Sequence, residues 1–348
     1  MNPLQVNPRI AIVGATGAVG DELLKLLISR EFPFSSLRCF ASEKSAGKTL
    51  HFDSKEIVIE KLEKNSFTDI DIALFTAGSS VAKQYAPFAK ESGCIVIDNS
   101  SAFRGDDCVP LLIPEINAHA LEKHLNIIAS PNCTTTIMLL ALAPLHRLFP
   151  IKRIVVSTYQ AASGAGKKAM KELEEASKAY LENRPFSPTV FPFPYAFNLF
   201  AHTSPLLPNG YVEEEMKMVR ETRKILEDDS IQIHATCIRV PVLRTHSEAL
   251  NVEFRERVTV EQAYEILSKA PGIKILENRQ ENRFPMPIDA KEKNDIYCGR
   301  IREDQSQKNT LDIWVVGDQL LKGAALNMIQ IAELILAAKP AEAGVAKQ

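Results

Sequence analysis

A buried-strand pattern followed at once by a glycine-rich turn constrains the fold of this chain most. The run Arg9 to Val13 is continuously β-branched or small, as in a parallel strand covered on both faces. It leads into Gly14-Ala15-Thr16-Gly17-Ala18-Val19-Gly20, and leucines at helical spacing fill 21–29. Strand, glycine turn and helix in this order predict a dinucleotide site, with the pyrophosphate at the helix N-terminus. The spacing is GxxGxxG rather than GxGxxG, so a glycine turn without a ligand stays an alternative.

The segment after the next predicted strand, 37–41, bears on which dinucleotide binds. NAD-binding folds usually have an acidic residue here, which holds the ribose 2′-hydroxyl. This strand ends on small residues instead, and Ser42, Lys44, Ser45 and Lys48 follow. These side chains could hold a 2′-phosphate, so we predict NADP as the cofactor. Glu43 would repel that phosphate and is expected to point away, and a solvated turn would explain the same composition.

Further strands at 71–75 and 94–98 end in loops that carry polar residues. Thr76 follows the first strand, and Asn99 to Arg104 follow the second. Open α/β sheets bind ligands along the rim where such strands end. Arg104 is therefore a candidate anion clamp, although a lone arginine in a loop is more often solvated.

Cys133 occupies the corner between a predicted strand, 125–129, and an apolar helical run, 135–148. A cysteine at the first turn of a helix meets unpaired backbone N–H groups and the positive end of the helix dipole. Both favour the nucleophilic thiolate, so Cys133 is a candidate nucleophile. The alternative is a small buried apolar residue, which is the usual role of a free cysteine.

The second half of the chain has a different pattern. Polar and apolar residues alternate in strands that we predict at 154–159, 231–240, 249–255, 296–302 and 310–316, with helices at 167–182, 212–227 and 260–269. A Pro- and Phe-rich stretch, 184–208, is expected to form an ordered arm at a subunit interface. An apolar helix over 318–338 is expected to return to the first domain.

The predicted fold class is therefore α/β: a Rossmann-type dinucleotide-binding domain followed by an α+β catalytic and dimerisation domain with a mostly antiparallel sheet. We place the first domain at 1–132, completed by the helix 318–338, and the second at 133–317, followed by a flexible tail at 339–348.

Composition excludes several classes of function. A net charge of −2 and the lack of a basic stripe disfavour nucleic acid as a partner. No apolar run reaches the roughly 20 residues that span a membrane, and 1–8 does not resemble a signal peptide. The six cysteines are scattered, without the spacing of a metal site or a disulfide framework. We expect a cytoplasmic enzyme without a metal ion.

A dinucleotide domain joined to a cysteine-bearing helix indicates a dehydrogenase that works through a thioester. Addition of a thiolate to an aldehyde gives a thiohemiacetal, whose oxyanion collapses and expels hydride. Such a site needs a general base beside the sulfur, donors for the oxyanion and an acceptor that releases the acyl group.

Motifs spread from about residue 8 to residue 336 resemble the aspartate-β-semialdehyde dehydrogenase family. Beside the glycine turn they are Asn99 to Arg104, Ser130-Pro131-Asn132-Cys133-Thr134-Thr135, Gln160 with Ser163 to Gly166, Glu214 to Lys217, Arg239 to Val242 with His246, and Lys322 to Asn327. The resemblance implies reversible, NADP-dependent reductive dephosphorylation of L-aspartyl 4-phosphate to L-aspartate 4-semialdehyde and phosphate. This reaction serves lysine (diaminopimelate), threonine and methionine biosynthesis. The family is at least dimeric, so a homodimer or a homotetramer is expected.

The resemblance also implies roles for single residues. Cys133 is the nucleophile, His246 the acid/base and Gln160 the group that positions the thioacyl intermediate. The substrate site is formed by Asn132, by Arg239 for the α-carboxylate, by Glu214 for the amino group, and by Lys217 and Arg104 for phosphate. The cofactor site comprises Gly14, Thr16, Gly17, Ala18, Val19, Gly20, Ser42, Lys44, Ser45, Thr76, Ser163, Gly164 and Asn327. Without the resemblance, His246 is as readily a loop histidine, and Glu214 with Lys217 a surface ion pair.

Two other functions compete with this one. N-acetyl-γ-glutamyl-phosphate reductase applies the same chemistry to a longer, acylated substrate, but Glu214 suits a free amino group. A non-catalytic NADP-binding sensor would have no use for Arg239 as a carboxylate clamp.

Overall fold

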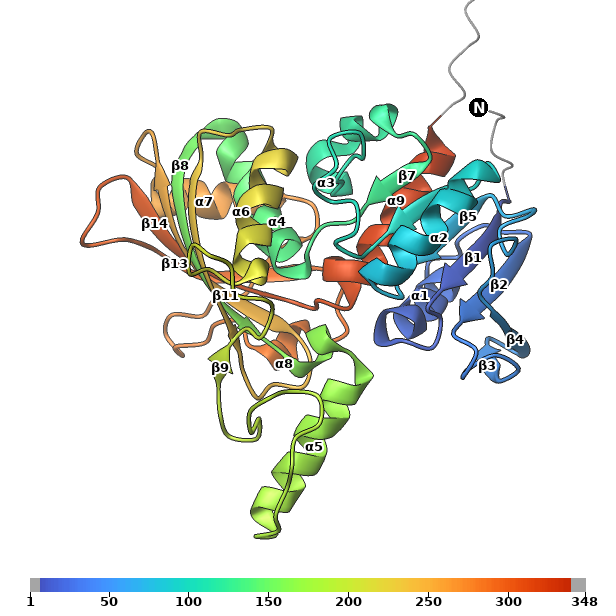
Figure 1. Ribbon diagram of the computed structural model, residues 1–348. Coiled ribbons are helices and arrows are strands. Elements are labelled where there is room, and N and C mark those ends of the chain that lie inside the picture. The colour runs from blue at the N-terminus through green and yellow to red at the C-terminus, as the bar shows by residue number, and fades with distance from the viewer. Residues whose placement is uncertain (1–6, 339–348) are drawn as a thin grey trace, which may run out of the picture.

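The computed structural model describes residues 7–338, in which the chain forms two seven-stranded sheets with their helices (Figure 1). The two sheets confirm the predicted fold class, a dinucleotide-binding α/β domain with a second, α+β domain. The predicted tail, 339–348, lies outside the described residues. Within 7–338, no helix is long and apolar enough to cross a membrane.

The first sheet has the strand order β3-β4-β2-β1-β5-β6-β7. Its strands are β1 (Arg9–Val13), β2 (Ser36–Ala41), β3 (Thr49–Phe52), β4 (Lys55–Lys61), β5 (Ile72–Phe75), β6 (Ile95–Asp98) and β7 (Ile127–Ala129). The β3–β4 hairpin, which the sequence did not indicate, is antiparallel, and the other pairs are parallel. The apolar runs of β5 and β6 are buried along their whole length, as a parallel sheet covered on both faces requires.

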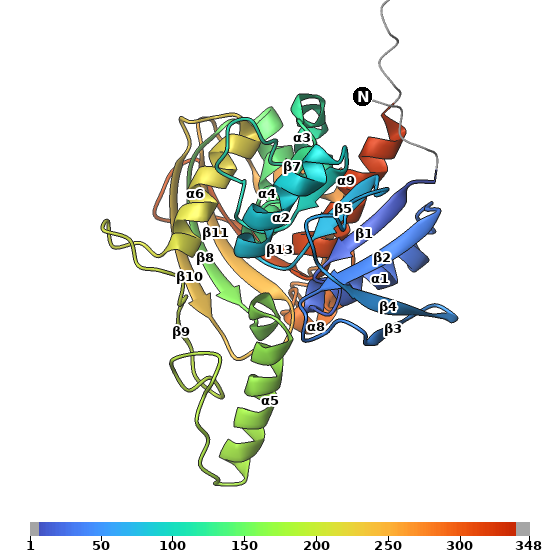
Figure 2. The ribbon, with the colours of Figure 1, turned by 45° about the vertical axis from the view of Figure 1, so that its right-hand side comes forward.

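Helices cover both faces of this sheet. Ile10 and Ile12 of β1 share a core with α1 (Ala18–Ser29) and α9 (Leu326–Ala337). Ala11 and Val13 face the other way, toward α2 (Ser79–Glu91). The predicted helix over 318–338 is present as a π-helical turn, Leu321–Ala325, continued by α9. Figures 1 and 2 both show α9 beside the strands of the first domain, so the end of the described chain packs on its beginning.

The second sheet has the order β12-β13-β14-β11-β8-β10-β9. Its strands are β8 (Ile151–Gln160), β9 (Phe200–Ala201), β10 (Gln232–Arg239), β11 (His246–Phe254), β12 (Ile273–Ile275), β13 (Ile296–Glu303) and β14 (Thr310–Gly317). The sheet is mostly antiparallel, as predicted, but β8 pairs with β10 and β12 with β13 in parallel. The parallel β8–β10 pair sets Gln160 opposite Arg239, so the two strands end side by side.

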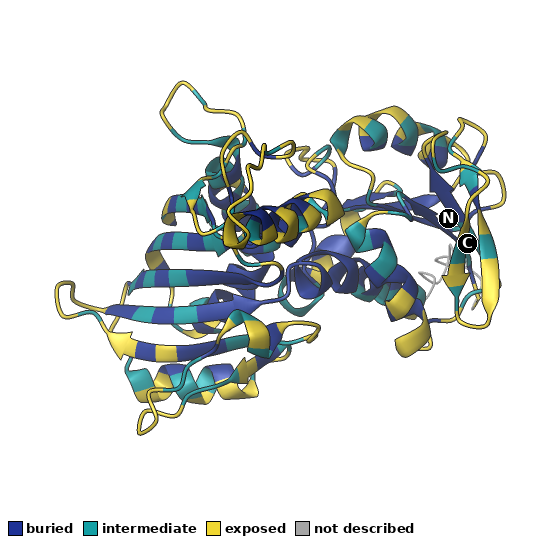
Figure 3. Cartoon of the chain, turned by 90° about the horizontal axis from the view of Figure 1, so that it is seen from below, coloured by how far each residue is buried: buried dark blue, intermediate teal, exposed yellow. Residues whose placement is uncertain are grey.

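The two faces of the second sheet differ in burial. One face packs against α4 (Cys133–Leu148), α6 (Glu213–Leu226) and α7 (Val260–Lys269) in the larger hydrophobic core. On the other face, side chains such as Val155, Ser157 and Tyr159 are only half-buried, and the strands are striped accordingly in Figure 3.

An arm extends from the second domain. It consists of α5 (Lys167–Leu181) and the chain that returns beside it, and it projects away from both sheets (Figures 1 and 2). The stretch 184–208 is irregular apart from β9, as expected. The carboxylate of Glu172 on α5 accepts the backbone N–H groups of Thr189, Val190 and Phe191, which fixes the returning chain to the helix.

The two short helices are α3 (Pro114–Asn117), followed by the 3-10 turn Ala118–Lys123, and α8 (Pro287–Ala290); a second 3-10 turn spans Ala162–Ala165. Helix α4 begins at Cys133, two residues earlier than predicted.

Candidate active site

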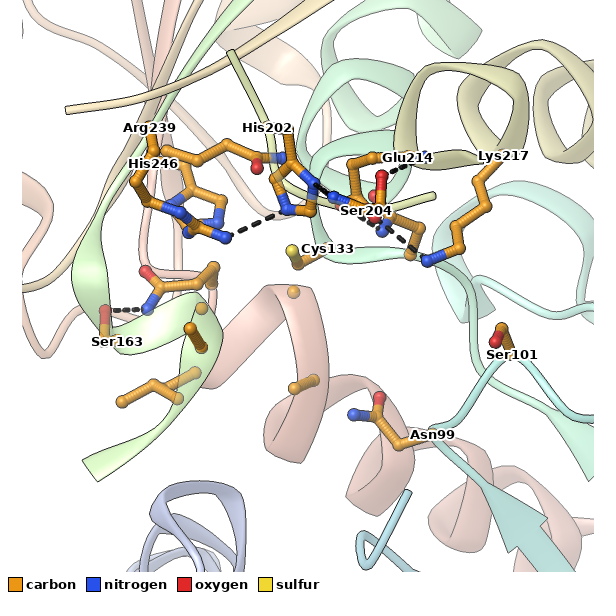
Figure 4. Close-up of a pocket in the computed structure, with 18 of the residues that line it drawn as sticks. Asn99, Ser101, Cys133, Ser163, His202, Ser204, Glu214, Lys217, Arg239 and His246 are labelled. Carbon is orange, nitrogen blue, oxygen red and sulfur yellow. Dashed lines mark hydrogen bonds and ion pairs between the residues drawn. The ribbon is translucent and has the colours of Figure 1, made fainter. Parts of the chain in front are cut away.

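A cavity of about 420 Å³ lies where the loops of the first domain meet the strand ends of the second. Both domains line it, and so does the segment 319–324, which leads into α9. Every residue that was predicted to act in catalysis or substrate binding lines this cavity: Arg104, Asn132, Cys133, Gln160, Glu214, Lys217, Arg239 and His246. Figure 4 shows how several of these side chains converge around Cys133.

Cys133 is the first residue of α4, and Asn132 caps the helix. The Asn132 Oδ1 accepts the backbone N–H groups of Thr134 and Thr135, at 3.0 and 3.4 Å. Gly323 lies directly against the nucleophile, because a Cβ built there would stand 2.8 Å from the Cys133 Cβ. The close approach of the 319–324 segment to Cys133 therefore requires glycine at this position.

The thiol of Cys133 is not activated in the substrate-free cavity. Burial raises the pKa of Cys133 to about 12, and Glu214 adds to the rise, while Arg104 and Arg239 oppose it. Desolvation and Glu214 therefore act against the effect that the helix N-terminus was expected to have on the thiol. The sulfur must lose its proton as the substrate reacts.

His246, at the start of β11, is buried with one ring nitrogen already engaged. Its Nδ1 accepts the backbone N–H of Ala161 at 3.0 Å, which leaves the proton of a neutral ring on Nε2. Burial, with the charge of Arg239, holds the pKa of His246 well below its usual range. Gly164 leaves room for this ring, since a Cβ there would lie 3.1 Å from Nε2. His246 thus rests as a neutral hydrogen-bond donor toward the cavity.

Arg239 is a buried cation without a carboxylate partner among residues 7–338. Its guanidinium donates to the Ala161 carbonyl at 2.7 Å and lies 5.6 Å from the centre of the Phe191 ring. A second nitrogen lies 2.9 Å from the Nε2 of His202. No Asp or Glu in the described chain lies within ion-pair distance of it. An unpaired arginine that faces a cavity is suited to a carboxylate ligand.

Glu214 supplies the opposite charge. It lies in the first turn of α6 and accepts from the side-chain amides of Asn132 at 2.8 Å and Gln160 at 3.3 Å. Its other oxygen pairs with the ammonium of Lys217 at 2.9 Å. Burial would raise the pKa of Glu214, but Lys217, His202 and Asn132 outweigh it and hold that pKa well below its usual range. Glu214 is therefore ionised. The Oε1 of Gln160 is buried and has no hydrogen-bond partner among residues 7–338.

Arg104 is held by both domains. It donates to the carbonyls of Ser130 and Asn99, at 2.9 and 2.7 Å, and pairs with Glu221 of α6 at 3.1 Å. The second oxygen of Glu221 accepts the backbone N–H of Asn132 at 2.6 Å. Sequence reasoning missed Glu221, because the family resemblance assigned roles on α6 only to Glu214 and Lys217, and a charged helix face is otherwise as readily solvated. Its spacing from Glu214 and Lys217, on one stripe of the helix, was the available signal.

The glycine turn has the geometry that a dinucleotide fingerprint requires. Gly14 has a φ of +93°, and a Cβ there would stand 2.7 Å from the Thr76 hydroxyl and 2.9 Å from the Ala77 nitrogen. A Cβ on Gly20 would lie 2.6 Å from the Gly14 carbonyl oxygen. Strand, turn and helix thus pack too closely for side chains at these two positions. Thr16, Gly17 and Ala18 lie within the same turn.

The other residues predicted to contact the cofactor are placed differently. Val19, Ser163 and Gly164 line the cavity, whereas Ser42, Lys44 and Ser45 lie on the surface turn after β2. The carboxylate of Glu43 pairs there with the ammonium of Lys61 at 3.1 Å.

Asn327 is buried away from the cavity. Its amide donates to the Leu112 carbonyl and the Ser130 hydroxyl, and its oxygen accepts from Lys322. A cofactor contact by this side chain would require that network to open.

Comparison with known proteins gives a consistent result. Residues 9–124 match the family model of the semialdehyde dehydrogenase NAD binding domain, and residues 142–322 that of the semialdehyde dehydrogenase dimerisation domain. The chain is 53% identical to the aspartate-semialdehyde dehydrogenase of Synechocystis sp., over 94% of this chain and 97% of the relative. It is 47% identical to that of Aquifex aeolicus, over 94% and 98%.

Solved structures agree. A crystal structure of aspartate semialdehyde dehydrogenase II from Vibrio cholerae, described as complexed with ASA, superposes with a TM-score of 0.93. It is 42% identical in sequence, over 96% of this chain and 99% of that chain.

Proposed function

The chain belongs to the semialdehyde dehydrogenase family, and from this premise we propose that it converts L-aspartyl 4-phosphate reversibly to L-aspartate 4-semialdehyde and phosphate, with NADP(H). It is an oxidoreductase of the aspartate-semialdehyde dehydrogenase type, since relatives of that name match at 42–53% identity over nearly the whole chain. We assign it to the biosynthesis of lysine, by way of diaminopimelate, and of threonine and methionine.

A pair of opposite charges around Cys133 carries the assignment of the substrate. Arg239 has no carboxylate partner in the described chain, and Glu214 is ionised and faces the same cavity. An α-amino acid with its reactive group on the side chain presents a carboxylate and an ammonium to such a pair. Arg239 would bind the carboxylate and Glu214 the ammonium, which leaves the aldehyde carbon for the sulfur.

The first chemical step joins the Cys133 sulfur to the aldehyde carbon. The S–H bond breaks, the C–S bond forms, and the proton ends on the former carbonyl oxygen, giving a thiohemiacetal. His246 would donate a hydrogen bond to this oxygen from its Nε2–H, because its Nδ1 already accepts the Ala161 N–H. Gln160 and Asn132 line the same cavity as Cys133 and would position the acyl group. Bound NADP, held at the glycine turn, would supply the hydride acceptor and donor for this step.

Phosphate accepts the acyl group in the other half-reaction. Lys217 and Arg104 line the same cavity and would bind its oxygens. Each is paired with a carboxylate, Lys217 with Glu214 and Arg104 with Glu221, so neither carries a wholly free charge.

The glycine turn is suited to a dinucleotide. Backbone atoms and Thr76 leave no room for a Cβ at Gly14 or Gly20, so the turn stays tight. The N-terminus of α1 then remains available to bind the pyrophosphate. We assign the 2′-phosphate of NADP to Ser42, Lys44 and Ser45. The pairing of Glu43 with Lys61 compensates the one carboxylate that would oppose it.

The decisive experiment measures NADPH formation from aspartate semialdehyde with and without phosphate. Phosphate-dependent reduction of NADP that is lost in Cys133→Ala is expected. Activity with N-acetylglutamate semialdehyde alone would assign the chain to the sister reductase, and activity with neither substrate would refute the proposal.

Glu214 separates these two substrates. An acylated amino group has no positive charge, so it would leave this buried carboxylate without its partner. Glu214→Gln should raise the KM for aspartate semialdehyde by roughly ten- to a hundredfold, the loss of one charge-assisted hydrogen bond. Glu213→Gln, one position earlier on α6 and paired with Arg220 outside the cavity, is the control. An unchanged KM in Glu214→Gln would contradict the assignment.

A dimerisation domain is present, which supports a homo-oligomer. We propose a homodimer, or a homotetramer built from it, that uses the half-buried face of the second sheet and the arm. Phe193, Phe197 and Leu199 of the arm are exposed in the single chain. A cytoplasmic location fits the free cysteines of the described chain.

A further inference from the structure

His202 faces a hydrogen-bond donor at each of its two ring nitrogens. Its Nε2 lies 2.9 Å from a guanidinium nitrogen of Arg239, and its Nδ1 lies 3.2 Å from the backbone nitrogen of Ser204 (Figure 4). A neutral imidazole has one acceptor nitrogen and one N–H. Whichever ring nitrogen carries the proton, its N–H therefore faces another N–H group, and that contact cannot be a hydrogen bond.

The backbone fixes this placement. Strand β9 pairs with β10 so that Phe200 is opposite Arg239, and the N–H of His202 donates to the Cys237 carbonyl at 2.8 Å. His202 is thus the diagonal neighbour of Arg239 on the face of the sheet that lines the cavity, within reach of a long side chain. A tether of this kind limits how far the ring can move away from the guanidinium.

Protonation of the ring does not resolve the contact. Burial lowers the pKa of His202 to about 4; Glu214 acts against this, and Arg239 and Lys217 add to it. At neutral pH the ring is therefore uncharged. A doubly protonated ring would also place donors against donors at both nitrogens.

A hydrogen-bond acceptor placed beside the His202 Nε2 and the Arg239 guanidinium would give each of these donors a partner. With the proton on Nε2, the Nδ1 accepts from Ser204, and the Nε2–H and the guanidinium are two neighbouring donors on residues that line the cavity. No carboxylate among residues 7–338 occupies that place. A ligand oxygen with a negative charge is what two converging donors require.

We propose that His202 is a second ligand of the substrate α-carboxylate, which accepts from the Nε2–H of His202 and from the guanidinium of Arg239 together. The inference rests on the proposed function, in which Arg239 binds that carboxylate. It adds a residue from the irregular stretch 184–208 to the substrate site. Two donors on one carboxylate fix its orientation, and so direct the aldehyde of the same molecule toward Cys133.

The test removes the donor from the protein and the acceptor from the substrate in turn. His202→Phe keeps a ring without an N–H, and His202→Gln restores an N–H near the position of Nε2. His234→Phe, on the neighbouring strand β10 and outside the cavity, is the matched control. Each protein is assayed with aspartate semialdehyde and with 3-aminopropanal, which lacks the carboxylate; competitive inhibition replaces turnover if the latter reacts too slowly.

His202→Phe is expected to raise the KM for aspartate semialdehyde by roughly ten- to a hundredfold, with the KM for phosphate nearly unchanged. His202→Gln should recover most of that loss. Wild type and His202→Phe should bind 3-aminopropanal equally well, because this compound has no carboxylate that His202 could contact.

Three results would overturn the inference. An equal loss on both substrates would give His202 a structural role only, and a loss confined to phosphate would place it in the phosphate site. An unchanged KM would leave Arg239 as the sole ligand. If His202→Phe does not fold, His202→Gln and His202→Ala are compared in the same way. Failure of the proposed function itself is distinct, since wild type would then show no phosphate-dependent reduction of NADP.

Discussion

Cys133 is subject to two opposed effects, and their balance decides how the nucleophile behaves. The helix N-terminus and two arginines favour the thiolate, whereas burial and Glu214 favour the thiol. The sequence reveals the first effect, because the corner and the helix can be predicted. It does not reveal the second, because burial by the 319–324 segment and by α6 depends on tertiary packing.

Alkylation of the substrate-free enzyme tests this balance. With the pKa of Cys133 raised to about 12, the rate of inactivation by iodoacetamide should rise about tenfold per pH unit up to at least pH 9.5, without a plateau. An unperturbed thiol would level off above its pKa of about 8.5. A plateau below that value would mean that the helix N-terminus prevails after all. Incorporation of the reagent into Cys133→Ser, measured by mass spectrometry, gives the slower reaction at the other cysteines.

Glu248 is a buried residue that the sequence did not single out. It lies on β11 two residues after His246, and neither carboxylate oxygen has a hydrogen-bond partner within the described part of the chain. Burial raises the pKa of Glu248 well above its usual range. An unfolded chain ionises this group at ordinary acidic pH, while the folded chain must keep it protonated. The raised pKa therefore stabilises the fold at low pH, and this stability is lost as the pH rises.

Glu248→Gln should accordingly stabilise the protein, and increasingly so as the pH rises above about 4.5. Near neutral pH we expect a gain of about 1–3 kcal/mol in the free energy of unfolding, measured by urea denaturation between pH 5 and pH 9. Glu253→Gln, farther along β11 and paired with Lys152, should show no such gain. A loss of stability that is constant over this range would show that the carboxyl has partners in solution.

At the scale of single elements, α6 connects the two domains around the site. Glu214 and Lys217 face the cavity, and one turn later Glu221 binds both Arg104 and the backbone N–H of Asn132. After another turn, the ammonium of Lys224 donates to the carbonyls of Arg104, Asp106 and Val109. One helix of the second domain thus holds the loop after β6 of the first.

Removing the charge of Glu221 should loosen both attachments. Glu221→Gln retains one acceptor oxygen and cannot serve Arg104 and the Asn132 N–H equally. We expect kcat to fall about tenfold or more and the free energy of unfolding to fall by about 1.5–3 kcal/mol. Steady-state kinetics and urea denaturation measure the two effects, with Glu213→Gln as the control on the outer side of α6. A kcat equal to that of the control would exclude a positioning role.

The sequence was informative for elements with a strong pattern and uninformative for the others. The strands β1, β5 and β6 are continuous apolar runs, so they could be recognised without knowing their partners. The hairpin β3–β4 is half-exposed and charged, and it has no such signal. Strand β9 has two residues, so no periodicity could indicate that it places His202 beside Arg239. Glu221 was missed because a buried and a solvated charged face have the same composition.

At the scale of the whole molecule, a buried cluster of ion pairs and a separate exposed ion pair connect the glycine turn and α1 to the second domain. Arg244, just before β11, pairs with Glu22 of α1 at 3.0 Å and with Asp318 at 2.7 Å. Lys167, at the start of α5, pairs with Asp21 at 2.6 Å and donates to the Thr16 carbonyl at 2.9 Å. The dinucleotide turn is thereby held against the domain that carries His246.

Loss of the buried Arg244 cluster should lower the free energy of unfolding far more than loss of a surface ion pair. Arg244→Gln leaves the buried Asp318 carboxylate without its cation and leaves Glu22 with Lys25 alone, so we expect a loss of about 3–5 kcal/mol in the free energy of unfolding. Arg257→Gln, which breaks the exposed pair with Glu303, should change it by less than about 1 kcal/mol. Urea denaturation compares the two. The KM for NADP should rise in Arg244→Gln alone; equal effects of both substitutions would contradict this account.

The packing of α9 on the first sheet also has a consequence for how the chain is made. The ribosome completes β7 more than two hundred residues before it completes α9, yet Ile10 and Ile12 of β1 share their core with that helix. At a synthesis rate of 5–20 residues per second, α9 is completed roughly 10–40 s after the strands of the first domain. During that time only α1 covers the face of the sheet that α9 later completes, so the apolar side chains that α9 will bury are exposed on the nascent chain, where a chaperone can bind them.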